Sequence, residues 1–444
     1  MSDVTASSIS ALAPQLKALT VSPVDVTRAC LARIEAHRSG NAFIAVRGDD
    51  AIAEARQAES EIAAGRYRSP LHGVPIAVKD LVDVAGMPTT SGSALPAYVP
   101  AHDAPVVRRL REAGAVIIGK TNLHEFAFGT TSEESAFGPV RHPIDPSRSA
   151  GGSSGGSAAA LALRMCYGAI GTDTGGSIRI PAAACGIVGL KPTLGELSCE
   201  GVVPLSHTLD HVGPMALTVA DAGLLYQGMK GTTIGTVAPA GGRLTFGVPG
   251  GYLQEPLDAD VARALERTRA ALRKAGHAVV DVSIPHAEWT ADVYLHIVLP
   301  EAAWYHAPLL AAHADKYCPG VRLRLEMGRY VLAEDYVRAL RLRDVLARSV
   351  EQSLAGCDVL LLAALAIPAA PIGAATVEVG GSTQPVRAAM LKLTQLFNMT
   401  GHPAISIPAG PGTDGLPRAV QLVGHRGRTD RLVEVAAAVE RALR

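Results

Sequence analysis

The chain has 444 residues, and its 41 basic and 41 acidic side chains give a formal net charge of zero. This balance provides no electrostatic surface for nucleic acid or an anionic membrane, so we expect neither as a partner. Hydrophobic residues make up 48% of the chain and charged residues 18%, which indicates a well-buried globular protein.

Helices are predicted for most of the first 65 residues. Apolar side chains recur at helical spacing over residues 6–20 and 24–36, and residues 49–64 are rich in alanine and glutamate. A continuous apolar run then predicts the first buried strand of the core over residues 75–79.

Strands and helices alternate from this point. A helix predicted over residues 104–113 leads to a second strand over 116–119, and this order is typical of a βαβ unit. The pattern returns after a connection rich in glycine, alanine and threonine at residues 231–243. Its elements are a strand at 245–248, a helix at 259–274, a strand at 278–282 and mostly helical residues 285–353.

No segment predicts secretion or insertion into a membrane, and we expect a cytoplasmic protein. The first residues lack the basic and long apolar segments of a secretion signal. The longest apolar run, residues 359–372, is interrupted by Pro368 and Pro371 and predicts a buried strand followed by a loop. Six dispersed cysteines without Cys-x-x-Cys spacing indicate neither a disulfide framework nor a zinc site, and we expect no metal or cofactor.

Two serines lie in glycine-rich segments that suit nucleophilic chemistry. Ser153 lies in Gly-Gly-Ser-Ser-Gly-Gly-Ser, and Ser177 ends Gly-Thr-Asp-Thr-Gly-Gly-Ser. A serine hydroxyl attacks a carbonyl only when a base takes its proton, and here the nearest candidate base is a lysine, Lys79, rather than a histidine. This combination indicates acyl transfer of a Ser-Ser-Lys kind.

The glycines before Ser177 favour this residue as the nucleophile, because they allow consecutive backbone N–H groups to point at a developing oxyanion. Lys79 can act as a base only when uncharged, and the apolar run before it makes burial plausible. Asp80 would keep the amine charged if it faced it, but adjacent side chains of a strand point to opposite faces. Ser153 has a hydroxyl that can relay a proton between Lys79 and Ser177.

Other interpretations of these segments are weaker. A glycine–serine heptapeptide alone is more often a flexible loop or a phosphate cradle, but no Gly-Lys-Ser or Gly-Lys-Thr follows it as in a Walker loop. The same residues satisfy Gly-x-Ser-x-Gly, a nucleophile elbow that requires a preceding strand. Residues 142–149 are too polar and rich in proline to form one.

The chain resembles the amidase signature family over essentially its full length. Residues 151–182 fit the family's long signature, including Asp173, Ser177, Arg179 and Pro181. Further stretches that resemble the family are residues 119–129, 189–193, 209–214 and 397–404.

This resemblance implies one large α/β domain over residues 1–444, with a central mixed β-sheet and helices on both of its faces. Within it we expect an N-terminal helical part over about residues 1–65, a signature core over about 66–230 and a variable substrate-side region over about 231–444.

The resemblance also implies a triad in which Lys79 is the base, Ser153 the bridging serine with a cis peptide bond, and Ser177 the nucleophile. The oxyanion would be bound by the backbone N–H groups of Thr174, Gly175, Gly176 and Ser177. Ser154, Asp173 and Arg179 would support these residues, and an ion pair between Asp173 and Arg179 beneath the oxyanion loop is one hypothesis.

Substrate residues are expected in variable segments of the family. In this chain they are the loop over residues 126–134, with Phe128, Gly129, Thr130 and Thr131, and the helical stretch 290–343. Trp304, Tyr305, Tyr330 and Tyr336 are candidates for an aromatic pocket, although ordinary core packing is the commoner role of such residues.

The function implied is hydrolysis of a carboxylic amide through an acyl-enzyme, with esters or carbamates as secondary substrates. The expected partner is a small-molecule amide, and the expected assembly is a monomer or homodimer. One alternative is the glutaminase component of a tRNA-dependent amidotransferase. The other is a catalytically silent binding protein on the same scaffold, which the presence of all three triad residues disfavours.

Overall fold

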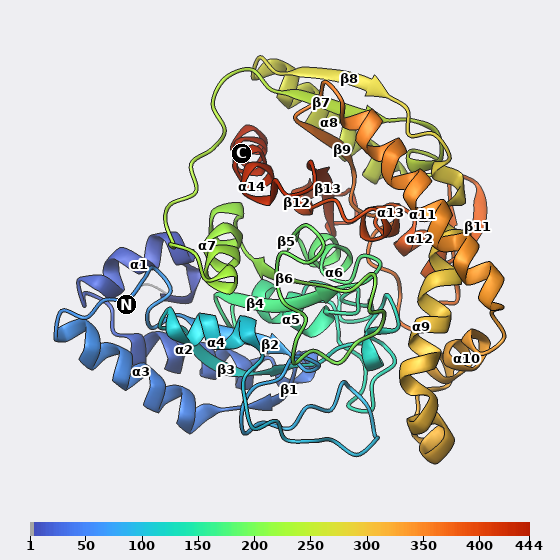
Figure 1. Ribbon diagram of the computed structural model, residues 1–444. Coiled ribbons are helices and arrows are strands. Elements are labelled where there is room, and N and C mark those ends of the chain that lie inside the picture. Colours follow the sequence, from blue (N-terminus) through green and yellow to red (C-terminus); the bar gives the residue numbers. More distant parts are fainter. Residues whose placement is uncertain (1–3) are drawn as a thin grey trace.

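The structure is a computed structural model that describes residues 4–444. An eleven-stranded mixed sheet runs through it, with helices on both sides (Figure 1). In spatial order the strands are β1 (Phe43–Val46), β3 (Val116–Thr121), β2 (Pro75–Lys79), β4 (Gly168–Asp173), β6 (His211–Ala216), β5 (Val188–Lys191), β12 (Ala404–Pro411), β13 (Pro417–Val423), β9 (Val359–Ala363), β7 (Thr245–Pro249) and β8 (Ala278–Val282). β10 (Thr376–Val379) and β11 (Ser382–Pro385) form a separate hairpin.

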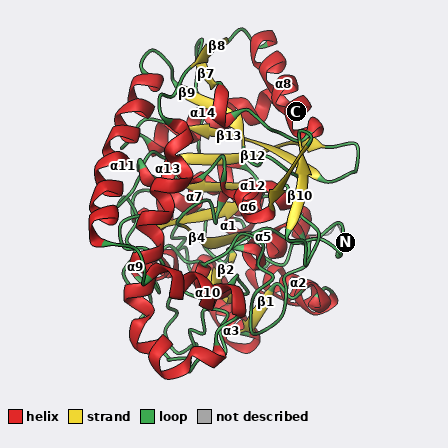
Figure 2. Cartoon of the chain, turned by 90° about the vertical axis from the view of Figure 1, so that its right-hand side faces the viewer, coloured by secondary structure: helices red, strands yellow, loops and turns green. Residues whose placement is uncertain are grey.

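The helices cover both faces of this sheet, and Figure 2 shows the strands stacked between them. In chain order they are α1 (Ile9–Lys17), α2 (Pro23–Ala36), α3 (Gly48–Ala63), α4 (Pro105–Glu112), α5 (Gly155–Ala162), α6 (Arg179–Cys185), α7 (Val219–Lys230), α8 (Ala259–Lys274), α9 (Thr290–His313), α10 (Pro319–Gly328), α11 (Ala333–Leu354), α12 (Val386–Leu391), α13 (Gln395–Met399) and α14 (Thr429–Leu443). The expected fold class, a single α/β domain around a mixed sheet, is confirmed.

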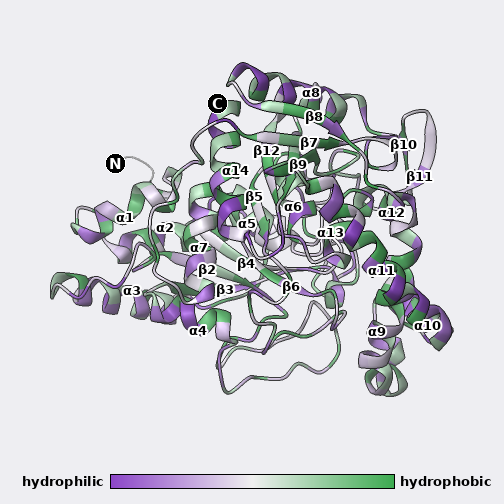
Figure 3. Ribbon diagram, turned by 45° about the horizontal axis from the view of Figure 1, so that its top comes forward, coloured by the Kyte–Doolittle hydropathy of each residue, from purple (hydrophilic) through white to green (hydrophobic). Residues whose placement is uncertain are grey.

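Local sequence explains where these elements begin and which side they bury. α8 starts after Asp258, whose carboxylate accepts hydrogen bonds from the N–H groups of Asp260 and Val261. Its buried apolar residues Val261, Leu265 and Leu272 follow helical spacing, and the outer side is charged. Figure 3 shows this division. The central strands are mostly hydrophobic, whereas hydrophilic and hydrophobic residues alternate along outer helices such as α3 and α8.

The strands predicted over 75–79 and 278–282 and the helix predicted over 259–274 have the observed bounds. Within residues 4–65 the structure contains a strand that the prediction lacks, β1, which pairs antiparallel with β3 at the edge of the sheet. This strand has four residues and an interrupted register, so it has too few alternating positions to stand out beside the long helical patterns.

One parallel pairing decides where the sequence motifs meet. β2 runs parallel to both β3 and β4, so the carboxyl ends of the three strands lie at the same edge of the sheet. β2 ends at Lys79 and β4 ends at Asp173, directly before the turn that carries Ser177. Among residues 4–444, no helix is both long and apolar enough to cross a membrane.

Candidate active site

Lys79 is fully buried at the end of β2. Its Nζ lies 2.7 Å from Oγ of Ser153 and 2.7 Å from Oγ1 of Thr172. The register explains the second contact, because Val78 of β2 lies opposite Ile170 of β4, two residues before Thr172. Sequence reasoning missed Thr172, although its position inside the signature and at the end of a neighbouring parallel strand could have indicated it.

The surroundings of Lys79 favour an uncharged amine. Burial lowers the pKa of Lys79 to about 7, and the negative charges of Asp173 and Asp210 act in the opposite direction. The pKa of a lysine in water is about 10.4, so desolvation outweighs both carboxylates here. A large fraction of the amine is therefore able to accept a proton at neutral pH.

Asp80 does not face this amine. Its carboxylate lies 2.9 Å from Nζ of Lys120, and both side chains are fully buried. It also accepts a hydrogen bond of 3.1 Å from the N–H of Thr90. The prediction that Asp80 points away from Lys79 is confirmed.

Ser153 lies in a loop directly before α5, as the glycine–serine segment predicts, and the peptide bond between Gly152 and Ser153 is cis, as the family resemblance implies. The carbonyl of Ser153 accepts hydrogen bonds from the N–H of His124 and the hydroxyl of Ser132, both at 3.1 Å. These two contacts fix the backbone that presents the Ser153 hydroxyl to Lys79.

Ser154 joins this loop to the turn that carries Ser177. Its N–H donates to the carbonyl of Ser177 at 3.1 Å, and its hydroxyl donates to the carbonyl of Thr172 at 3.2 Å. Ser177 is 6% exposed, so a small part of it remains accessible from outside. Together with the contact between Lys79 and Ser153, this bond brings the three predicted triad residues into one place.

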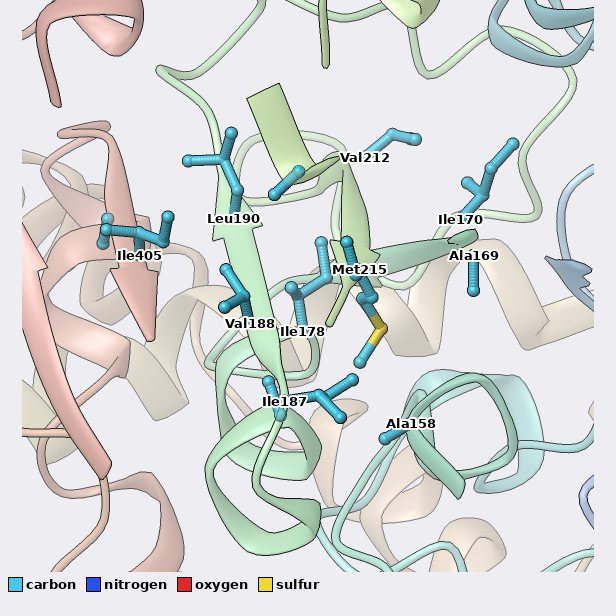
Figure 4. Packing of buried hydrophobic residues seen from close by; sticks show 14 of the residues in the cluster. Ala158, Ala169, Ile170, Ile178, Ile187, Val188, Leu190, Val212, Met215 and Ile405 are labelled. Atoms are coloured by element: carbon cyan, nitrogen blue, oxygen red, sulfur yellow. The ribbon is translucent and has the colours of Figure 1, made fainter. Parts of the chain in front are cut away.

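The next residue anchors the turn in the core. Ile178 inserts between β4, β5 and β6, where Figure 4 shows it packed near Val188, Leu190 and Met215. The three strands carry glycines at this point, and a Cβ on any of them would come within 3.0 Å of Ile178. These glycines are Gly171, Gly189 and Gly213. Because these glycines have no side chains, Ile178 fits against the sheet. Its packing also fixes the position of the adjacent Ser177.

The predicted oxyanion loop offers backbone N–H donors and is closely packed against neighbouring side chains. Among residues 4–444, no group accepts a hydrogen bond from the N–H of Gly175, Gly176 or Ser177. Thr394 Oγ1 donates to the carbonyl of Gly175 at 2.6 Å and would lie 2.3 Å from a Cβ on Gly176. The hydroxyl of Tyr294 would lie 2.5 Å from a Cβ on Gly175.

The hypothesis that Asp173 and Arg179 pair is confirmed. Both side chains are fully buried, and Nη2 of Arg179 lies 2.9 Å from the Asp173 carboxylate. Arg179 also donates to Oε1 of Gln421 at 2.6 Å and to Oδ1 of Asn398 at 2.7 Å. The guanidinium and the amide of Asn398 hold the pKa of Asp173 well below its usual range, although burial opposes this.

Asp210 supports the other side of the oxyanion loop. Its carboxylate accepts hydrogen bonds from the hydroxyl of Thr174 and from the N–H groups of Leu205 and Ser206. Burial raises the pKa of Asp210 to about 6, so the group is charged at neutral pH. The family resemblance placed Asp210 in a motif but assigned it no role.

The loop predicted to contact substrate lies beside the triad loop. A Cβ on Gly152 would come 2.9 Å from the N–H nitrogen of Thr131 and 2.7 Å from that of Ser132. Phe128 and Thr130 are buried, and a Cβ on Gly129 would overlap the ring of His124. The position of the loop agrees with the expectation, and contact with a substrate stays a prediction.

The aromatic residues proposed to form one pocket do not all line the same cavity. Trp304 and Tyr336 line a cavity of about 340 Å³ together with His207. Tyr330 does not line it and is 85% exposed. Tyr294, which sequence reasoning did not single out, is the tyrosine that touches the oxyanion loop.

The fold and these contacts define an α/β protein suited to serine hydrolase chemistry, with a buried lysine in contact with one glycine-flanked serine and a second such serine on the adjoining turn. Within residues 4–444, no group of three or more His, Cys, Asp or Glu side chains could hold a metal ion. A family model described as Amidase matches residues 25–433, and the chain therefore belongs to the amidase signature family.

Known relatives are similar over almost the whole chain. An amidase from Pseudomonas putida is 40% identical over 439 residues, which cover 94% of this chain and 92% of that protein. A component of the glutamyl-tRNA(Gln) amidotransferase from Anaeromyxobacter dehalogenans is 38% identical, covering 96% and 94%. A crystal structure of an amidase superposes with a TM-score of 0.93 at 38% identity, covering 98% and 99%. The chain is an amide-hydrolysing enzyme.

Proposed function

We propose that the enzyme cleaves a carboxylic amide through an acyl-enzyme formed on Ser177, with Ser153 and Lys79 as the proton relay. The observation that carries this proposal is the 2.7 Å contact between the Lys79 amine and the Ser153 hydroxyl in a fully buried environment. A buried lysine with a pKa of about 7 has an uncharged amine that can accept the proton a serine nucleophile must lose.

In the first half-reaction, Oγ of Ser177 attacks the amide carbon while its proton passes to Ser153 and the proton of Ser153 passes to Nζ of Lys79. The carbonyl oxygen becomes an oxyanion and accepts hydrogen bonds from the unpaired N–H groups of Gly175, Gly176 and Ser177. As the C–N bond breaks, the Lys79 ammonium returns the proton through Ser153 to the leaving nitrogen, because an unprotonated amine leaves badly.

In the second half-reaction a water molecule attacks the ester carbon of the acylated Ser177. Its proton follows the same relay to Lys79 and then returns to Ser177 as the ester bond breaks. A carboxylic acid leaves, and the three side chains recover their starting protonation states. Esters and carbamates offer the same carbonyl to Ser177 and are proposed as secondary substrates.

Labelling with a fluorophosphonate tests the triad. We expect one adduct, mapped by mass spectrometry to Ser177, and no adduct in Ser177→Ala. Ser153→Ala should retain the thermal unfolding midpoint of the parent chain and lose roughly 100-fold or more in amide turnover, the range found for proton-transfer catalysis. An adduct on another serine, or near-normal turnover in Ser153→Ala, would contradict the assignment.

The glutaminase component of an amidotransferase is the second candidate, favoured by the 38% identical relatives that belong to glutamyl-tRNA(Gln) amidotransferases. It predicts ammonia release from glutamine that rises when partner proteins are added. A stand-alone amidase should hydrolyse a panel of aliphatic and aryl amides without any partner, and the assay of the isolated chain separates the two.

We also propose a cytoplasmic enzyme with a small-molecule amide as its partner, acting as a monomer or homodimer. The six cysteines are free thiols in the structure, which agrees with a reducing compartment.

A further inference from the structure

An arginine that forms no hydrogen bond or ion pair among residues 4–444 lies beside the loop that is predicted to contact substrate. The guanidinium carbon of Arg387, in α12, lies 5.6 Å from the centroid of the Phe128 ring, and that of Arg324 lies 5.4 Å from the same ring. Phe128 belongs to the loop that is predicted to contact substrate. Two guanidinium groups therefore flank one aromatic side chain beside the triad loop.

The charges of these two arginines are balanced differently. Arg324 donates to Glu134 at 2.9 Å, and Glu134 also contacts Nε2 of His124 at 3.1 Å. Among residues 4–444, no group accepts a hydrogen bond from Arg387 or forms an ion pair with it. One carboxylate thus faces two guanidinium groups, because Glu133 directs its carboxylate to the N–H of Gly373.

The histidine in this cluster adds no charge. Burial lowers the pKa of His124 to about 4, so its ring is neutral at physiological pH. Burial also lowers the pKa of Arg387, to about 10, with the neighbouring Arg324 acting in the same direction. Arg387 therefore stays protonated, and a cluster formed by Arg324, Arg387, Glu134 and His124 keeps a formal charge of one positive unit.

The space in front of Arg387 adjoins the oxyanion loop. Arg387 lines a cavity of about 360 Å³, whose walls include Leu295 and Leu391. A methyl carbon of Leu391 would lie 3.1 Å from a Cβ on Gly175, so one wall of the cavity is also in contact with the oxyanion loop. Arg387 is close enough to Tyr294, the other neighbour of Gly175, for its charge to affect the phenol.

The lining of this cavity combines apolar walls with positive charge. Ala291, Leu295, Pro385, Ala388 and Leu391 are apolar, and Lys392 contributes a second cation. The ammonium of Lys392 donates to the carbonyl of Glu255 and lies 5.1 Å from the centroid of the Tyr252 ring. A partly buried guanidinium that forms no ion pair of its own among residues 4–444 binds a carboxylate well, because its planar fork matches the two oxygens.

From this geometry we propose that Arg387 determines specificity by binding a carboxylate group of the substrate, so that the enzyme acts on amides that carry a second, ionised carboxyl group on an apolar spacer. This inference rests on the proposed function, since it assumes that Ser177 attacks the amide carbonyl. The single positive charge of the cluster matches a monoanionic carboxylate.

The test compares matched substrates. One series contains monoamides of linear dicarboxylic acids, a second contains amides whose amine part carries a carboxylate, and each has a neutral partner in which a methyl group replaces the carboxylate. We expect the wild-type enzyme to prefer the acid over its neutral partner in kcat/KM, in at least one series. Arg387→Gln should lower this preference roughly 10- to 100-fold, the range for a hydrogen-bonded charge.

Two further variants complete the design. Arg387→Lys should recover part of the preference, because it keeps the charge and loses the fork. Arg56→Gln, which removes an exposed arginine of α3 outside every segment linked to substrate, should leave the preference at its wild-type value. Fluorophosphonate labelling of Ser177 and the thermal unfolding midpoint show that each variant is folded.

The outcomes separate this inference from the proposed function. If neutral amides are hydrolysed and the acids have no advantage, or if Arg387→Gln keeps the full preference, Arg387 does not bind a carboxylate and the triad assignment stands. If Ser177 is not labelled and no amide is hydrolysed, the proposed function fails, and this inference fails with it.

Discussion

A lysine can take a proton from a serine only while its amine is uncharged, and single residues around Lys79 decide when that is so. Burial is the dominant influence, and it lowers the pKa of Lys79 to about 7. The negative charges of Asp173 and Asp210 raise the pKa and limit the effect. With Lys79 as the proposed base, we expect the acid limb of activity to be set by the balance between desolvation and two carboxylates.

This balance predicts the pH dependence of the enzyme. Lys79 is protonated below its pKa, so kcat/KM should fall about tenfold for each pH unit below about 7. Asp210→Asn removes a charge that raises the Lys79 pKa, and the acid limb should therefore move to lower pH. Asp49→Asn changes an exposed carboxylate of α3 and should leave the limb in place. A pH–rate profile of the three proteins checks this, and a limb that moves to higher pH in Asp210→Asn would contradict it.

At the scale of the element, the turn between β4 and α6 contains glycines that cannot be replaced by larger residues. Neighbouring elements pack directly against them and leave no room for a side chain. Gly176 has a φ of +143°, and a Cβ there would lie 2.3 Å from Oγ1 of Thr394. Both the backbone conformation and the space around the residue exclude a side chain. The donors of the loop are consequently held by a segment more than 200 residues further along the chain.

Gly176→Ala should reduce the rate of fluorophosphonate labelling of Ser177 by roughly 100-fold or more, since displacing one oxyanion donor costs this much. Gly195→Ala is the matched control, because Gly195 also has a positive φ, +80°, but nothing lies within 4 Å of its Cβ position. We expect it to lower stability by about 1–2 kcal/mol and to label at the normal rate. Equal labelling rates for the two variants would show that this close packing does not position the donors.

The sequence indicated some residues of the candidate site and not others, and the difference has a physical reason. Lys79, Ser153 and Ser177 could be proposed as a triad because they lie in short sequence segments of unusual composition. Thr394 and Tyr294 could not, because each acts through a tertiary contact with the oxyanion loop and belongs to an ordinary helical or loop sequence. Arg387 was missed for the same reason, since its interest lies in tertiary surroundings that give it no ion pair among residues 4–444.

At the scale of the whole molecule, Arg179 joins parts of the chain that are far apart in sequence. It begins α6, pairs with Asp173 at the end of β4, and donates to Asn398 of α13 and Gln421 of β13. The last two residues lie 219 and 242 positions from it. One fully buried guanidinium thus connects the signature segment to helix α13 and to strand β13 of the same sheet.

Arg179→Met should destabilise the protein by about 3–5 kcal/mol, because it leaves the Asp173 carboxylate buried without its counter-charge. Arg338→Met removes an exposed ion pair with Asp335 and should cost less than about 1 kcal/mol. Unfolding midpoints in urea compare the two. Similar small shifts in both variants would mean that other groups neutralise Asp173.

The link made by Arg179 has a consequence for how the enzyme matures during its synthesis. The turn that presents Ser177 is translated more than 200 residues before Thr394, Asn398 and Gln421, which hold its surroundings. A nascent chain that ends at residue 350 would contain Lys79, Ser153 and Ser177 but lack these three supporting contacts, and we expect it to be inactive. We therefore expect hydrolytic activity only after synthesis has passed about residue 421.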